Sequence, residues 1–149
     1  MAQEMYKHEA LLHLVWAIAN ADEPITNVWS NQISDEEKEY FDRIAKAEGI
    51  EINFSDFIDK RISLGDKYGW DSIIEEALKA TNGCAREWRT KVYGYMWSMA
   101  LESWEGGYNC INDERKMVSE KEMEIIRRAK AYFSITPDED DKAMSLTKV

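Results

Sequence analysis

The chain has 149 residues, of which 44% are apolar, and its formal net charge is −10. This length and composition predict one ordinary domain with a real core, and they exclude an intrinsically disordered chain. The acidic balance argues against a nucleic-acid partner and against an anionic membrane surface, because both are bound through Lys and Arg. A cation, a basic partner or good solubility remains open as the reason for the charge.

Cys84 and Cys110 are the only cysteines. Neither belongs to a CxxC pair or a histidine cluster that would indicate zinc. The first residues carry no basic-then-apolar signal segment, and no apolar run approaches the roughly 18 residues of a spanning helix. We therefore expect a soluble cytoplasmic protein.

Apolar residues recur at three-and-four spacing, and only two prolines occur, so the chain is expected to be all-helical. The first helix is predicted over 5–21. It is apolar around most of its circumference, which is typical of a central helix. A polar loop over 22–33 leads to an amphipathic second helix that begins at Ser34 and stops at Gly49. Glycine supplies the left-handed conformation there, and Ile50 closes the cap.

Two further helices are predicted over 54–64 and 70–81, with Gly65 and Gly69 between them. A fifth helix is predicted over 85–104 and is again apolar almost all round. The fifth helix therefore mirrors the first, and both are expected to lie in the core.

An acidic loop leads from the fifth helix to a sixth that begins near Ser119 and ends near Phe133. The last residues begin with Pro-Asp-Glu-Asp-Asp and have no sustained apolar stripe. We predict a single-domain bundle of about six to seven helices over 1–135 and an acidic flexible tail over 136–149.

One pattern occurs twice, 85 positions apart, over 33–50 and 118–135. Each copy opens with a capping box, in which a Ser hydroxyl caps a free helix-start amide and a Glu reaches back. Duplication of one unit is the economical explanation, and it predicts internal pseudo-two-fold symmetry. The identical pairs are Ser34 and Ser119, Glu37 and Glu122, Glu39 and Glu124, Arg43 and Arg128, and Ile50 and Ile135.

Four carboxylates hold matching places in the two copies. Asp22 and Glu105 end the two long apolar helices, while Glu37 and Glu122 lie in the first turn of the helix that follows each loop. Carboxylates that converge at a helix start offer the hard oxygen ligands that Ca²⁺ or Mg²⁺ requires. A capping box and the helix dipole also favour acidic residues there without any metal. The pattern leaves capping and cation binding both open.

The first copy resembles the TerB-like family of tellurite-resistance proteins. It reads as an apolar helix, then Ala-Asn-Ala-Asp-Glu over 19–23, Ile-Ser-Asp-Glu-Glu over 33–37, Ile-Ala at 44–45 and Gly-Ile at 49–50. The family's loop usually reads Ala-Asp-Gly-x-Ile-x-x-x-Glu, whereas here Glu23 replaces the Gly and the loop is longer. In the second copy Glu105 replaces the Asp, and Gly106 follows as the pattern asks.

The resemblance implies a helical, cytoplasmic protein associated with stress or metal response. It also implies that acidic residues bind a divalent cation, namely Asp22 and Glu37 in the first copy and Glu105 and Glu122 in the second.

No Gly-rich phosphate loop and no nucleophile with a recognisable base occur, so we do not expect an enzyme. His8 and His13 stand five positions apart rather than the four of a zinc-protease helix, so they are expected on different faces. The leading hypothesis is a non-catalytic TerB-like protein that binds a divalent cation. The alternative is a helical protein–protein interaction module or homodimer with no metal function, in which Trp29 contacts the partner.

Overall fold

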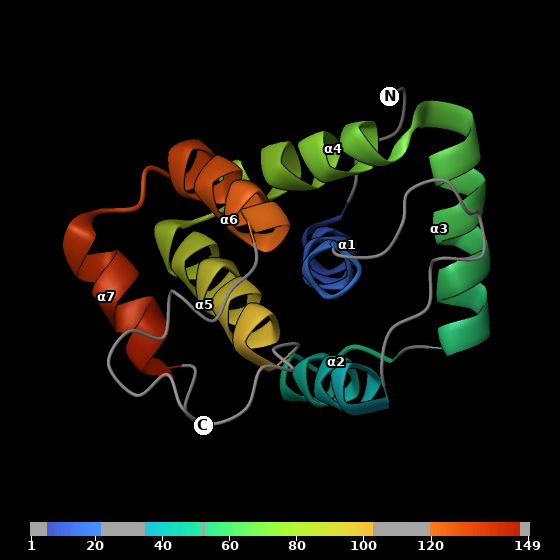
Figure 1. Ribbon diagram of the computed structural model, residues 1–149, viewed down its shortest axis with the longest axis horizontal. Helices are drawn as coiled ribbons and strands as arrows, with labels where there is room; N and C mark the ends of the chain where they lie inside the picture. Colours follow the sequence, from blue (N-terminus) through green and yellow to red (C-terminus); the bar gives the residue numbers. More distant parts are fainter. Residues whose placement is uncertain (1–5, 22–34, 52, 103–119, 147–149) are drawn as a thin grey trace.

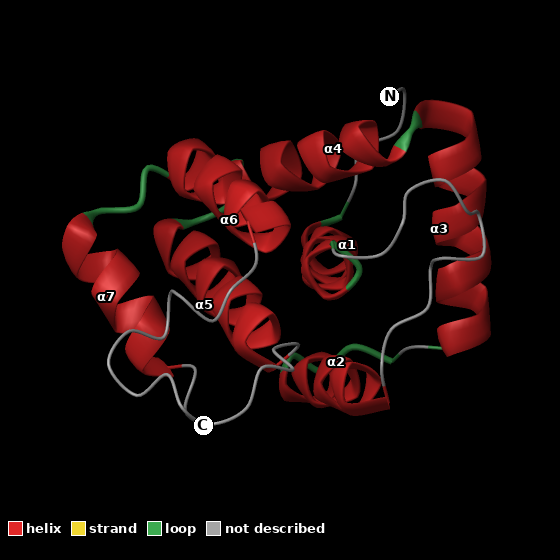
Figure 2. Ribbon diagram, in the orientation of Figure 1, coloured by secondary structure: helices red, strands yellow, loops and turns green. Residues whose placement is uncertain are grey.

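The computed structural model describes residues 6–21, 35–51, 53–102 and 120–146. Within these residues the chain is all-helical and contains no strand (Figure 1 and Figure 2), which confirms the predicted fold class. No helix in this part of the chain is long and apolar enough to cross a membrane. The helices are α1 (Lys7–Ala19), α2 (Asp35–Ala47), α3 (Phe54–Tyr68), α4 (Trp70–Asn82), α5 (Arg86–Glu102), α6 (Glu120–Phe133) and α7 (Pro137–Leu146).

Helix α1 lies at the centre of the fold. Figure 1 shows it end-on, with α2, α3, α4, α5 and α6 arranged around it. Every residue from Ala10 to Ile18 is buried. A helix that is apolar on all sides is buried only where other helices surround it, so the predicted central position is confirmed.

Helix α5 is the second buried helix. From Val92 to Ala100 only Tyr95 is partly exposed. The helix contacts α1, α2 and α6 and carries α7 on its outer side (Figure 1). The two long apolar segments of the sequence thus form the two helices on which the others pack.

The first copy of the repeated pattern ends in a Schellman cap, as the sequence predicts. Gly49 has a φ of 67°. The amide of Ile50 donates to the Ala45 carbonyl at 2.8 Å, and the amide of Gly49 donates to the Lys46 carbonyl at 3.1 Å. These bonds satisfy carbonyls that the end of α2 would otherwise leave open.

The second copy ends in the same cap without a glycine. Ser134 has a φ of 53°, the one positive φ among the described non-glycine residues. The amide of Ile135 donates to the Lys130 carbonyl at 3.1 Å, and that of Ser134 to the Ala131 carbonyl at 3.3 Å. The two copies therefore end alike, whereas the capping serines that open them lie outside the described residues.

Gly65 is not the helix end that the sequence suggested. Helix α3 continues through it to Tyr68 and ends at Gly69, whose φ of 85° turns the chain into α4. A Cβ at Gly65 would lie 2.4 Å from the indole of Trp70. The glycine is therefore required for close packing of that ring on α3 and does not stop the helix.

The prediction of a flexible tail over 136–149 is wrong for the part that forms α7. Thr136 and Glu139 build a capping box, because Thr136 Oγ1 accepts from the Glu139 amide at 3.2 Å and Glu139 carries an oxygen 2.9 Å from the Thr136 amide. The Tyr93 hydroxyl donates to buried Asp140 Oδ1 at 2.6 Å. Polar contacts fix α7 on α5, so the lack of an apolar stripe was misleading.

Candidate functional site

The structure gives no side-chain position for three of the four predicted cation ligands. Asp22 and Glu105 lie outside the described residues, and so does the side chain of Glu37. Glu122 lies in the first turn of α6 and is only 3% exposed. Among the described residues, no group of three or more His, Cys, Asp or Glu side chains is gathered as metal ligands would be. Cation binding therefore stays a prediction.

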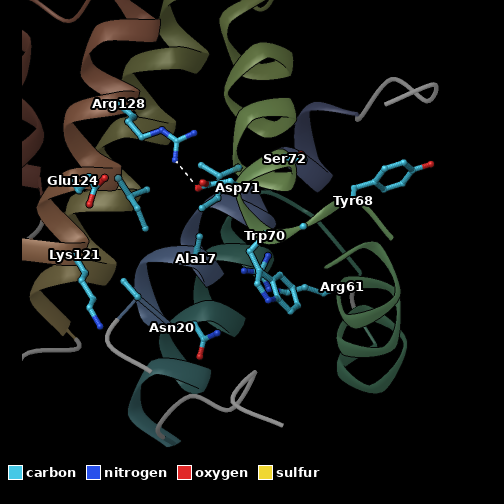
Figure 3. Close-up of a pocket in the computed structure, with 14 residues that line it drawn as sticks. Ala17, Asn20, Arg61, Tyr68, Trp70, Asp71, Ser72, Lys121, Glu124 and Arg128 are labelled. Atoms are coloured by element: carbon cyan, nitrogen blue, oxygen red, sulfur yellow. Dashed lines mark hydrogen bonds and ion pairs between the residues drawn. The ribbon is translucent and has the colours of Figure 1, made fainter. Parts of the chain in front are cut away.

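A cavity of about 550 Å³ opens between the end of α1, the junction of α3 and α4, and α6 (Figure 3). This volume is within the usual range for small-molecule sites. Polar and charged side chains from the same four helices complete the lining. The apolar wall consists of Ala17, Ala21, Trp70, Ile74 and Ile125.

The indole of Trp70 is held in the wall by one face of α3. Arg61 and Gly65 are four residues apart and so share that face. The Arg61 guanidinium carbon lies 5.2 Å from the indole centroid. The missing side chain at Gly65 lets the six-membered ring approach the α3 backbone closely. Because Gly69 reverses the chain immediately before Trp70, the ring folds back onto α3 and its position is fixed.

Arg61 is a buried cation beneath this ring, with 3% of its surface exposed. Its Nη1 donates to Nδ1 of His13 at 3.2 Å. A guanidinium only donates, so His13 Nδ1 must accept, and the imidazole is neutral with its proton on Nε2. Burial lowers the pKa of His13, which agrees with this tautomer. Burial also lowers the pKa of Arg61 to about 9, so the guanidinium stays charged at neutral pH.

Glu9 and Lys60 extend this network to the surface. Glu9 Oε1 lies 3.6 Å from His13 Nε2 and 2.6 Å from Lys60 Nζ. The nearby His13 N–H, aided by Lys60 and opposed by partial burial, lowers the pKa of Glu9 to about 2. His13 is 1% exposed, whereas His8 is exposed. The expectation that the two histidines face different surroundings is confirmed.

Arg128 borders the cavity from α6 and ties that helix to α4. Its Nη1 lies 3.3 Å from Asp71 Oδ1, and its Nη2 lies 3.2 Å from Glu75 Oε2. The Tyr132 hydroxyl also donates to Glu75. The bond from Tyr132, with help from Arg128, lowers the pKa of Glu75. These contacts close one end of the cavity with paired charges (Figure 3).

No protein-family model, curated protein or solved structure matches the chain.

The other end of the cavity offers polar groups that are not used internally. Asn20 is the C-cap of α1, and its Oδ1 is buried without a hydrogen-bond partner in the described structure. Lys121 and Glu124 are exposed on α6, and neither forms an ion pair with a described residue. Figure 3 shows Asn20 and Lys121 toward the same end of the cavity, away from Arg128. A bound molecule would find hydrogen-bonding groups here beside an apolar wall.

Sequence reasoning missed this cavity. Its walls come from α1, α3, α4 and α6, so no single periodic segment reveals it. Arg128 and Glu124 belonged to the repeated pattern, but only their acidic neighbour Glu122 was assigned a role. The one local signal was Gly69 followed by Trp70, a turn that places a large ring at a helix start.

Proposed function

We propose that this chain is a non-catalytic, TerB-like helical protein that binds a small organic molecule in the cavity between α1, α3, α4 and α6. One observation carries the proposal: the cavity of about 550 Å³ combines the Trp70 indole with a buried, unpartnered oxygen of Asn20. An apolar wall with a few placed polar groups is the usual composition of a small-molecule site. An unsatisfied buried polar group costs about 1–3 kcal/mol, which a ligand that hydrogen-bonds to the Asn20 carboxamide would recover.

The TerB-like part of the proposal draws on the sequence resemblance, which supplies the context of stress or tellurite resistance. Two features of the fold support it. The chain is all-helical over the described residues, and both copies of the repeated pattern end in the same cap, at Gly49 and Ser134. Binding without catalysis agrees with the absence of any recognisable nucleophile motif in the sequence.

A cavity-filling variant tests the proposal. Ala21 is half-buried in the wall, so Ala21→Trp should occupy much of the space, while Ala80→Trp changes an equally half-buried alanine that does not line the cavity. A mixture of small acids, amines and neutral ring compounds would be screened by saturation-transfer NMR and thermal melting. Hits should disappear in Ala21→Trp and persist in Ala80→Trp. Hits that bind both variants equally would contradict the proposal, as would a screen without hits.

Binding of a divalent cation is the second candidate function, through Asp22 and Glu37 in the first copy and Glu105 and Glu122 in the second. The observation that favours it is the position of Glu122 in the first turn of α6, the helix start where the sequence pattern places a cation ligand. Calorimetry and melting curves with Ca²⁺, Mg²⁺, Mn²⁺ and Zn²⁺ test it, with Asp22→Asn as the variant. Neither heat nor stabilisation from any of these ions would contradict cation binding.

A further inference from the structure

Three described side chains that line the cavity are cationic hydrogen-bond donors. Arg61, Lys121 and Arg128 all line it, and guanidinium and ammonium groups donate but never accept. Two carboxylates oppose them, but Asp71 already lies 3.3 Å from an Arg128 nitrogen. Arg61 and Arg128 are already bound to other side chains, so Lys121 is the cationic donor that a bound molecule would satisfy by supplying an acceptor.

The charge of the lining also departs from that of the whole protein. The full chain carries a formal charge of −10, yet among the described residues of the cavity lining three cationic side chains face two carboxylates, and a third carboxylate, Glu75, is bound to Arg128. Helix α4 begins at the cavity with no side-chain cap on its first amides, so its dipole adds partial positive charge there. An anion is attracted here more than elsewhere on an acidic surface.

Trp70 gives the cavity a flat apolar surface. Gly65 and Arg61 cover the indole from α3, and the part of the ring that lines the cavity lies with Ile74 and Ile125. Aromatic groups gain from offset stacking on such a ring in addition to the apolar area that they bury. A planar ligand fits this wall better than a branched one.

Lys121 and Asn20 form the polar end of the cavity. Lys121 has no ion-pair partner among the described residues. The oxygen and nitrogen of the Asn20 carboxamide exchange places when the group turns by half a revolution, so the amide can donate to an acid group as readily as it accepts. Arg128, by contrast, is already held by Asp71 and Glu75.

From these features we infer that the ligand is a small planar organic anion, an aromatic carboxylate or aryl phosphate. Its ring lies against Trp70, and its acid group binds Lys121 and Asn20. The inference rests on the proposed function, because it names the chemical class that the same cavity accepts.

Four probes that share one ring test the class: benzoate, phenyl phosphate, benzyl alcohol and benzylamine. Binding would be followed in ¹H–¹⁵N NMR spectra by the indole N–H of Trp70, assigned with Trp70→Phe. The two anions should bind most tightly, benzyl alcohol more weakly and benzylamine least. Affinity for the anions should fall as salt is raised.

Two exposed residues on α6 give reciprocal variants. Lys121→Gln removes a charge-assisted hydrogen bond and should weaken benzoate binding about tenfold, while benzyl alcohol is unaffected. Glu124→Gln removes a repulsive charge and should strengthen benzoate binding. Lys46→Gln changes the net charge equally at an exposed site on α2 that does not line the cavity, so it should have no effect.

The results separate the two levels of the argument. If benzyl alcohol or benzylamine binds as tightly as benzoate, or Lys121→Gln leaves benzoate affinity unchanged, the anionic class is wrong while the small-molecule site stands. If no probe moves the Trp70 signal and the broader screen gives no ligand sensitive to Ala21→Trp, the proposed function itself fails.

Discussion

Acidification should destabilise this protein through one residue, His13. The imidazole is 1% exposed and accepts a hydrogen bond from Arg61 at 3.2 Å, so it is neutral in the fold. Protonation would place two donors against each other at that distance. Glu9, 3.6 Å away on the other side, attracts the charge that Arg61 repels. Because these two effects oppose each other, burial decides the direction and lowers the pKa of His13 below its ordinary 6.5.

The magnitude follows from proton linkage. In the unfolded chain a histidine takes up a proton as the pH falls through about 6.5, while His13 in the fold does not, so stability is lost on acidification. The slope cannot exceed about 1.4 kcal/mol per pH unit. Between about pH 7.5 and about pH 5 the loss integrates to about 2 kcal/mol at most. Glu9 stays ionised in this window because its pKa in the fold is about 2. It affects the pH dependence of stability only as the pH falls below its unfolded pKa of 4.5.

Urea unfolding at several pH values would measure this effect in the wild type and in two variants. His13→Gln keeps a group that accepts from Arg61 and donates to Glu9 but does not titrate, so its stability should depend less on pH by up to about 2 kcal/mol. The only other histidine, His8, is exposed, and His8→Gln should retain the wild-type slope. Only the pH dependence is compared, because His13→Gln also loses the ring contact with Phe57 at 5.1 Å.

Two results would refute this reasoning. One is an unchanged slope in His13→Gln, which would mean that His13 titrates alike in the folded and unfolded chains. The other is a slope removed by His8→Gln, which would assign the titration to the exposed histidine instead.

Four further variants test backbone conformation, packing and capping. Gly49→Ala should lower the free energy of unfolding, measured in urea, by about 1 kcal/mol, because a Cβ there meets nothing within 4 Å and only the positive φ is strained. Ser134→Gly should raise the free energy of unfolding by about 0.5–1 kcal/mol, because glycine adopts a positive φ without strain. Gly65→Ala should cost about 1–3 kcal/mol and shift the indole N–H signal of Trp70, because the new methyl group would lie 2.4 Å from that ring. Thr136→Ala should cost about 1 kcal/mol and speed hydrogen exchange in α7, by removing the cap at 3.2 Å.

The helices themselves could be predicted from sequence because their information is local. Three-and-four spacing located them, and the apolar circumference of α1 and α5 predicted their burial. The end of α2 followed from Gly49 and Ile50. The misplaced end of α3 and the missed α7 have one cause. In both places a contact between two helices decided the outcome, Trp70 of α4 on Gly65 of α3 and Tyr93 of α5 on Asp140 of α7.

The candidate site could not be predicted in this way, because identical residues of the repeated pattern have different neighbours. Arg43 is 58% exposed, and it contacts two side chains of its own helix, Glu39 at 3.9 Å and the Tyr40 ring, whose centroid lies 5.4 Å away. Its counterpart Arg128 is 30% exposed and bridges to Asp71 and Glu75 on α4.

The reason is packing: α6 contacts α4, while α2 contacts α1 and α5. Because α6 packs beside α4, the second copy of the pattern forms part of a cavity wall. A function performed twice, once by each acidic loop, was the natural expectation from the sequence. Among the described residues, the lining of the cavity includes residues of the second copy and none of the first, so replacing Arg43 should leave ligand binding in the cavity unchanged whereas replacing Arg128 should alter it.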